Sequence, residues 1–141
     1  MENKNNKKRF AEYNFNKSFL PAGKRNSITD VGGVRVGHYT KIEGEDVRTG
    51  VTIIDPGITN LFGNKIPAAI AVGNGYGKLA GITQVHELGT LEASIGLTNT
   101  LAVGTVMRGI IDIVLVEDKN VGPTDSINAV VGETNDGLLN D

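Results

Sequence analysis

The chain has 141 residues, which is enough for one domain with a buried core. Its formal net charge is −2 and 21% of its residues are charged, so the composition indicates neither a nucleic-acid partner nor a membrane partner. The lack of cysteine excludes disulfides and thiolate metal sites, and no apolar run approaches the ~18 residues that span a bilayer. We expect a cytoplasmic protein whose 19 glycines form tight turns and close backbone contacts.

Residues 1–25 are predicted to form a flexible leader ahead of a body that spans 26–141. A basic cluster near the start contains Lys4, Lys7, Lys8 and Arg9. A solvated segment is the favoured interpretation of this cluster, and a nucleic-acid-binding arm is the alternative. Five apolar side chains could still dock part of the leader onto the body, namely Phe10, Tyr13, Phe15, Phe19 and Leu20.

The body begins with strand-like patterns that are separated by turns. The expected strands are Val34–Val36, Thr49–Asp55, Pro67–Val72, Ser94–Thr98 and Ile127–Val131. The second should end at the turn signal Pro56-Gly57. The third, PAAIAV, is a continuous run of small apolar residues, which is typical of a strand buried on both faces.

One amphipathic helix is expected between the fourth and fifth strands. Apolar residues recur at helical spacing from Val103 to Leu115, and Asn99 or Thr100 can cap the start. Gly104 and Gly109 disfavour a helix, so we expect them to admit a sheet or a second helix at close range. Strands with a long packed helix predict an α/β or α+β fold.

The loop Gly73–Lys78 reads GNGYGK and follows the apolar run PAAIAV. Glycine-rich loops after strands can bind phosphate, but this loop lacks the spacing of a P-loop and of a dinucleotide fingerprint. A tight structural loop is the main interpretation, and a ligand-lining loop with Asn74 or Tyr76 facing the substrate is the alternative.

Two other groups of polar residues give weaker signals. His38 and His86 are far apart in the sequence, and neither belongs to a metal-binding motif. Glu43, Glu45 and Asp46 share one loop but lack EF-hand spacing, so we expect a solvated loop. We therefore assign no metal-binding or cofactor-binding residues.

The segment GETNDGLLND, residues 132–141, places Glu133, Asn135 and Asp136 after an apolar strand. A carboxylate beside a buried strand costs free energy unless it is paired. Glu133 therefore needs either a structural cation or a ligand cation, and the residues alone do not decide between them. We expect the chain to be part of a larger protein, truncated at its C-terminus near the active site.

Several motifs in order resemble the DmpA-type aminopeptidases, also called the P1 family or the L-aminopeptidase/D-esterase and β-peptidyl aminopeptidase family. The motifs are NSITDVGGVRVGH, VRTGVTII, NGYGKLAG, ELGTLEASIGLTNTLAVGTV and VVGETNDGLLND. The resemblance spans about residues 26–141 and corresponds to the N-terminal part of a longer precursor. It implies a four-layer αββα sandwich that resembles the N-terminal-nucleophile (Ntn) hydrolases.

The resemblance also implies an activity. The precursor would cut itself before a serine, which then attacks the peptide, amide or ester substrate and releases its first residue. Glu133 would bind the substrate ammonium, and Asn135 could line the pocket. The nucleophile and its supporting groups would belong to a missing C-terminal part, so no catalytic residue is assigned here, and Ser94 and Ser126 do not lie in its motif. A homo-oligomer is expected.

Other interpretations remain open at this point. Among enzymes, the chain could be a fragment of a related acyltransferase or oligoamide hydrolase. It could instead be an amino-compound-binding module that uses Glu133, or a structural fragment without a function of its own.

Overall fold

The computed structural model describes residues 10–13 and 20–140, and the chain divides into two units, Met1–Gly32 and Gly33–Asp141. In the first unit, short 3-10 helices span η1 (Phe10–Tyr13) and η2 (Ile28–Asp30). The Asp30 carboxylate accepts hydrogen bonds from the backbone N–H groups of Arg25 and Ser27 and so closes the turn before η2. The basic cluster, Phe15 and Phe19 lie outside the described residues.

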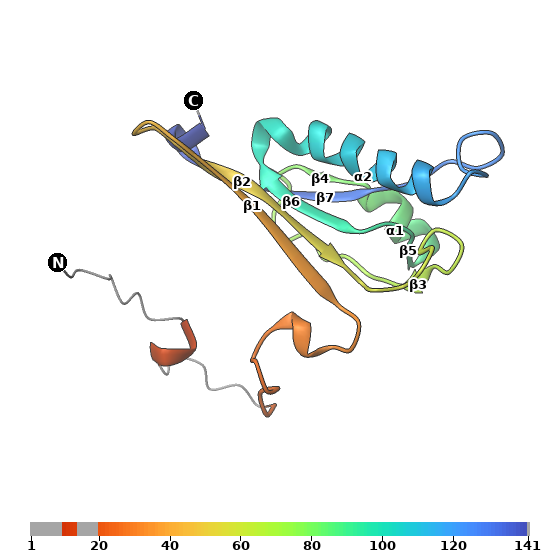
Figure 1. Cartoon of the computed structure of the whole chain (residues 1–141), viewed down its shortest axis with the longest axis horizontal. Helices are drawn as coiled ribbons and strands as arrows, with labels where there is room; N and C mark the ends of the chain where they lie inside the picture. The colour runs from red at the N-terminus through yellow and green to blue at the C-terminus, as the bar shows by residue number, and fades with distance from the viewer. Residues whose placement is uncertain (1–9, 14–19, 141) are drawn as a thin grey trace. The chain divides into compact units, whose positions relative to one another are not determined.

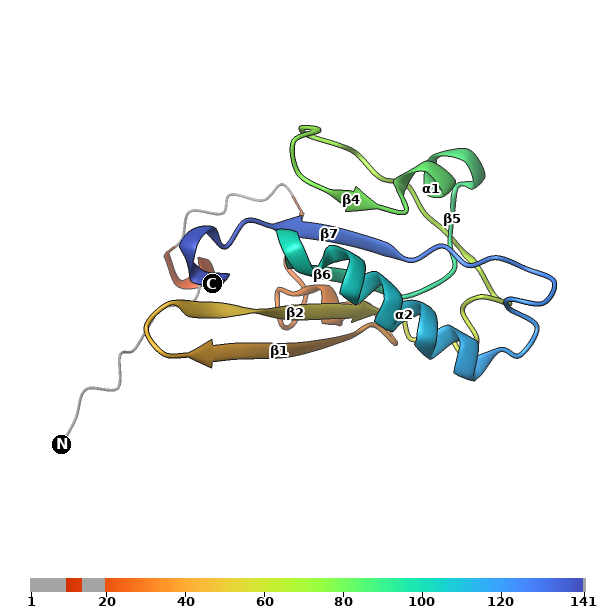
Figure 2. The ribbon, with the colours of Figure 1, turned by 90° about the horizontal axis from the view of Figure 1, so that it is seen from above.

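The second unit is built on a five-stranded mixed sheet (Figures 1 and 2). In spatial order its strands are β1 (Arg35–Glu43), β2 (Val47–Asp55), β6 (Ile95–Asn99), β7 (Val130–Thr134) and β4 (Leu79–Ala80). β1, β2 and β6 pair antiparallel in succession, β6 and β7 are parallel, and β4 pairs antiparallel with β7. As expected, β2 ends directly before Pro56-Gly57, and Gly57 has φ +75°.

The parallel pair is connected through a helix that covers one face of the sheet. From β6 the chain continues into η3 (Thr100–Ala102), α2 (Val103–Glu117) and then β7 (Figure 2). Asn99 caps η3, since its side chain accepts a hydrogen bond from the Ala102 N–H at 2.9 Å. Ile110 and Val114 of α2 are buried against Val131 of β7. The predicted helix and the predicted strand at Ser94–Thr98 are therefore confirmed.

The close approach between helix and sheet occurs at a glycine of the sheet. A Cβ atom on Gly96 would lie 2.7 Å from Val106 Cγ1 and 3.1 Å from Ile110 Cδ1. Apart from the neighbouring residues and backbone of α2 itself, no described heavy atom lies within 4 Å of the Cβ position of Gly104 or Gly109. The expectation that these two helix glycines admit a neighbour is therefore wrong, because both face open space.

A smaller layer packs on the other side of the sheet at its β4–β7 end. It contains α1 (Ile82–Leu88) and a two-stranded sheet of β3 (Ile66–Pro67) and β5 (Thr90–Leu91). Val85, Leu91 and Val130 form its buried centre. The helix α1 was not predicted from the sequence, because its seven residues are too few for a clear helical periodicity.

Three strand predictions need correction. The first strand is Arg35–Glu43 and is longer than the expected Val34–Val36, because its pairing with β2 continues to Glu43. The run Pro67–Val72 is not a strand buried on both faces, because β3 ends at Pro67 and the following residues are irregular and partly exposed. The fifth strand is Val130–Thr134 rather than Ile127–Val131, because its pairing with β6 continues as far as Asn99. Glu133 thus lies within the strand and not after it.

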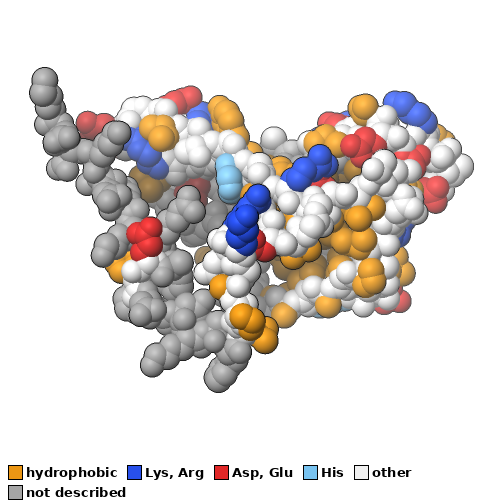
Figure 3. Space-filling model, turned by 60° about the horizontal axis from the view of Figure 1, so that its bottom comes forward, with side chains coloured by type: hydrophobic (Ala, Val, Ile, Leu, Met, Phe, Trp, Pro, Cys, Tyr) orange, Lys and Arg blue, Asp and Glu red, His pale blue; other side chains and the backbone are white. Residues whose placement is uncertain are grey.

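Part of the sheet face opposite α2 is open. The register places Ile54, Ile95 and Leu97 on this face, and Leu97 is 36% exposed. Hydrophobic side chains gather on the side of the molecule seen in Figure 3. In the described part of the chain, the outer edge of β1 pairs with no other strand. No helix among the described residues is long and apolar enough to cross a membrane.

We predict that Gly96→Val destabilises the fold by about 1–3 kcal/mol, because its side chain would overlap Val106 and Ile110 of α2. Gly109→Ala is the matched variant, and it should stabilise the fold by about 0.5–1 kcal/mol, since its Cβ meets no neighbour. Urea denaturation followed by circular dichroism measures both. A Gly96→Val protein as stable as the parent would contradict the tight packing.

We also predict that the 141-residue chain, expressed by itself, self-associates through its open sheet face and the edge of β1. Light scattering after size exclusion at several concentrations measures the mass. Ile42→Lys, which places a charge on the edge strand, should reduce association. A compact monomer with a cooperative melt and no dye-binding surface would count against this prediction.

Candidate functional site

The carboxyl ends of the parallel strands β6 and β7 lie at the same edge of the sheet. The register pairs Thr98 with Glu133 and Asn99 with Thr134, so four polar residues end the two strands side by side. In open α/β sheets, ligands bind outside the carboxyl ends of parallel strands. This edge is therefore the candidate functional site.

On the side of this edge that faces β2, the polar side chains form hydrogen bonds with one another and with the backbone. Asn99 Nδ2 donates to Thr49 Oγ1 at 2.9 Å, and the Thr49 hydroxyl donates to the Asp136 carboxylate. The Thr98 hydroxyl donates to the Gly50 carbonyl at 3.0 Å, which fastens β6 to β2. Asp136 thus has a structural partner, and this network orders the chain that follows β7.

Glu133 differs from Asp136 because its carboxylate is buried without a close partner. Its side chain is 9% exposed, and Oε2 forms no hydrogen bond with any described residue. Among the described residues it forms an ion pair with Lys78, whose Nζ lies 3.7 Å from Oε2. At that distance the contact is an ion pair without a hydrogen bond. Arg108 is instead paired with Asp112 at 2.8 Å on α2.

The backbone explains why Lys78 reaches Glu133. β4 pairs with β7 through Leu79 and Gly132, and at the next position the Glu133 N–H donates to the Lys78 carbonyl at 3.1 Å. Residues that face each other across an antiparallel pair project toward the same side. The sequence gives no sign of this partnership, because the strand β4 has two residues and therefore no periodic pattern.

The loop Gly73–Lys78 lies beside Glu133. The Asn74 side chain accepts the Tyr76 N–H at 3.0 Å and so shapes the turn. Tyr76 is 89% exposed, and its ring centroid lies 5.6 Å from Lys78 Nζ. A Cβ atom on Gly77 would lie 3.7 Å from Glu133 Cγ, so the backbone of the loop passes directly along the carboxylate.

Asn135, the second predicted site residue, is exposed and belongs to a turn. Its Oδ1 accepts the Gly137 N–H at 2.7 Å. This turn leads into η4 (Gly137–Asn140).

The two histidines occupy different elements. His38 on β1 is hydrogen bonded to Thr52 on β2 at 2.8 Å, and His86 on α1 to the Ile70 carbonyl at 2.9 Å. Glu43 pairs with Lys41 at 3.2 Å beside the β1–β2 turn, where Glu45 and Asp46 are exposed. Among the described residues no group of three or more acidic or histidine side chains could hold a metal ion.

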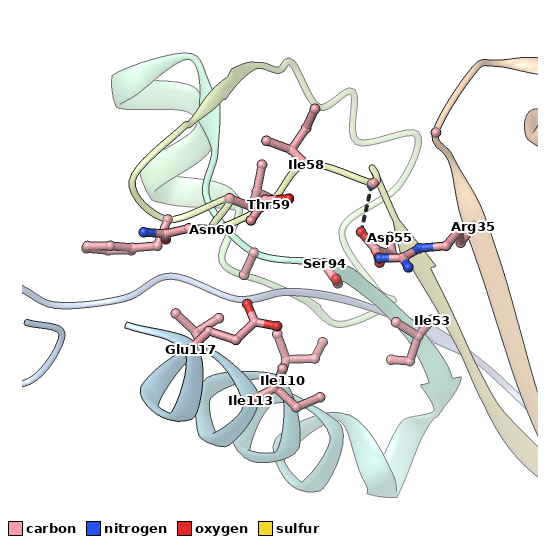
Figure 4. Close-up of a pocket in the computed structure, with 16 residues that line it drawn as sticks. Arg35, Ile53, Asp55, Ile58, Thr59, Asn60, Ser94, Ile110, Ile113 and Glu117 are labelled. Atoms are coloured by element: carbon pink, nitrogen blue, oxygen red, sulfur yellow. Dashed lines mark hydrogen bonds and ion pairs between the residues drawn. The ribbon is translucent and has the colours of Figure 1, made fainter. Parts of the chain in front are cut away.

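A cavity of about 710 Å³ lies away from Glu133, at the opposite end of β6 (Figure 4). Apolar residues of α2 and of the loop after β2 form much of its wall, with Glu117 and the Arg35–Asp55 ion pair beside them. Ser94 also lines it, but no histidine or lysine is among the described lining residues. Nothing in this cavity therefore resembles a serine nucleophile with its base.

Near the Glu117 side of this cavity, the Asp118 carboxylate accepts hydrogen bonds from two other residues. Its carboxylate accepts the Asn120 N–H at 2.9 Å and the Asn60 side-chain amide at 3.1 Å. These two hydrogen bonds, with the Asn120 backbone contribution first, lower the pKa of Asp118. Asp118 thus ties the end of α2 to the loop that follows β2.

Two β-peptidyl aminopeptidases are similar to this chain. It is 41% identical over 128 residues to the β-peptidyl aminopeptidase BapA of Sphingosinicella xenopeptidilytica, and the match covers 84% of this chain and 31% of that protein. The corresponding protein of Sphingosinicella microcystinivorans is 34% identical, with the same coverage. The chain therefore spans about a third of the length of these relatives.

Solved structures agree with this similarity. The PH0078 protein of Pyrococcus horikoshii has a TM-score of 0.83 and 44% identity, over 89% of this chain and 38% of that one. A Burkholderia sp. β-aminopeptidase has a TM-score of 0.69 and 38% identity, over 86% and 35% of the two chains.

The L-aminopeptidase D-Ala-esterase/amidase of Ochrobactrum anthropi matches with a TM-score of 0.72 and 30% identity, over 86% of this chain and 36% of that one. It is described as a prototype of the serine aminopeptidases and a variant of the Ntn hydrolase fold, which confirms the expected fold class. The family model for peptidase family S58 matches residues 26–141. The resemblance to DmpA-type aminopeptidases is thereby confirmed, and this chain belongs to peptidase family S58.

Proposed function

We propose that this chain forms the amine-binding part of a serine aminopeptidase that removes N-terminal residues from peptides, amides or esters. The observation that carries the proposal is the Glu133 carboxylate, which is buried and has an oxygen without a hydrogen bond. A buried anion of this kind is compensated well by a desolvated cation. The free ammonium of a peptide substrate is such a cation.

The position of Glu133 supports this role. It lies at the carboxyl end of a parallel strand, where α/β proteins bind ligands, beside a glycine-rich loop whose backbone passes along the carboxylate. Holding the ammonium at a fixed point sets which amide bond reaches the nucleophile, so that one residue is released at a time. Asn135 would line the pocket beyond the ammonium.

The reaction itself would use groups from the part of the protein that the S58 relatives carry beyond the matched third. A serine hydroxyl, freed as a new N-terminus when the precursor cuts itself, attacks the substrate carbonyl and expels the remaining peptide, ester alcohol or amine. Water then attacks the acyl-serine and releases the free N-terminal residue. We further propose a cytoplasmic homo-oligomer.

We predict that the 141-residue chain by itself does not hydrolyse aminoacyl-p-nitroanilides, because loss of the nucleophile and the oxyanion donors removes most of the rate enhancement. The release of nitroaniline by the purified chain measures this. Turnover above that of a mock preparation, abolished by one substitution within residues 26–141, would refute the prediction.

In the full-length enzyme, Glu133→Gln should reduce kcat/KM for free-amine substrates by roughly 30-fold or more, since breaking a buried charge pair costs about 2–5 kcal/mol. The parent enzyme should cleave substrates with an acylated amine poorly, and Glu133→Gln should reduce kcat/KM for these substrates much less. Self-cleavage should mostly survive because it involves no free amine.

The matched control is Glu45→Gln, which removes an exposed carboxylate in the β1–β2 turn and should leave both substrate classes unchanged. Equal losses for free and acylated substrates, in a folded and processed Glu133→Gln enzyme, would show that Glu133 is structural.

A further inference from the structure

Lys78 and Glu133 form an unequal ion pair. The Glu133 side chain is 9% exposed, whereas that of Lys78 is 56% exposed. The 3.7 Å separation leaves Oε2 without a hydrogen bond from the ammonium. The buried anion is therefore held by a cation that remains largely in water.

A second buried carboxylate of the chain has both an ion pair and a backbone hydrogen bond. Glu92 is buried, and Lys65 Nζ lies 3.5 Å from its Oε2. The other oxygen of Glu92 accepts the Asn128 N–H at 2.6 Å, so that carboxylate joins two segments of the chain. Oε2 of Glu133 accepts no hydrogen bond from the described residues, which separates it from a carboxylate with a purely structural role.

Solvent and the Tyr76 ring stabilise the Lys78 ammonium, so that moving it away from Glu133 costs the lysine little free energy. Its ammonium already lies within 5.6 Å of the Tyr76 ring centroid, inside the range of a cation–π contact. Tyr76 and much of the Lys78 side chain face solvent, so a displaced ammonium would be rehydrated. Only the Lys78 end of this ion pair is exposed, and an ammonium that is already hydrated gains little free energy from pairing.

We infer that Lys78 is a tethered competitor for the amine site: its ammonium neutralises Glu133 in the empty enzyme and is displaced by the substrate ammonium. The inference rests on the proposed function of Glu133. A substrate without a cation cannot replace Lys78 without leaving the buried carboxylate unpaired, so the competition disfavours acylated or neutral N-termini. Lys78 would therefore be a specificity-determining residue.

The test measures binding and turnover in the full-length enzyme. Lys78→Met should lower KM for free-amine substrates, and the inhibition constant of propylamine, by about two- to fivefold, the range for release of a partly exposed ion pair. The kcat for these substrates and the weak inhibition by propanol should stay at parental values. Lys78→Arg, which keeps the cation, should leave the propylamine constant within twofold of the parent.

Lys65→Met is the matched control, because it removes the corresponding lysine from the Glu92 pair, away from β7. It should not change the propylamine constant. In a Glu133→Gln background, Lys78→Met should have no further effect, since the anion for which it competes is gone.

The outcomes separate the two proposals. If the Lys78→Met enzyme binds propylamine as the parent does, or more weakly, the competitor role is overturned. A larger loss of kcat/KM for free-amine substrates than for acylated substrates in Glu133→Gln would then still support the amine site. Equal losses for both substrates in Glu133→Gln would overturn both proposals. If Lys78→Met misfolds, Lys78→Gln replaces it, with the same expected shift.

Discussion

The parallel pairing of β6 with β7 is the constraint on which the rest of the second unit depends. A parallel connection requires a crossover, and α2 supplies it. The helix can lie close to the sheet because Gly96 of β6 presents no side chain to Val106 and Ile110. The apolar face of α2 then covers Val131 and removes the centre of the sheet from water.

The same pairing creates the candidate site. Parallel strands bring their carboxyl ends to one edge, so Thr98 and Asn99 of β6 lie beside Glu133 and Thr134 of β7. The network through Thr49 and Asp136 satisfies the polar groups on one part of this edge. Glu133 is left with an ion pair to a largely exposed lysine and with an oxygen that accepts no hydrogen bond from a described residue, and we propose that a cationic ligand uses this oxygen.

Membership of peptidase family S58 relates the geometry of this site to the hydrolysis of amide bonds. The matched relatives are about three times as long as the aligned segment, so the catalytic groups of the proposed reaction would come from elsewhere in such a protein. The role assigned to Glu133 is tested in the full-length enzyme, where binding of an amine and cleavage of an amide are separable measurements.

Much of the fold follows from local pattern in the sequence. The apolar stripe from Val103 to Leu115 determined α2, because its period of 3.6 residues has few alternatives. β-branched residues and the Pro56-Gly57 turn similarly determined β2. The carboxylate of Glu133 was identified as needing a partner because of its charge next to an apolar strand.

Tertiary structure decided what local pattern could not. PAAIAV is apolar enough for a strand, yet its residues after Pro67 are irregular, because the pairing of β3 with β5 involves two residues of each strand. The glycines of α2 proved to face open space, and the close contact fell instead on Gly96, since which face of a helix meets a sheet depends on the partner. Lys78 became the partner of Glu133 through the antiparallel pairing of β4 and β7, which joins positions 55 residues apart. A long-range pairing of this kind leaves no periodic trace in the sequence, and it is set by the packing of the whole sheet.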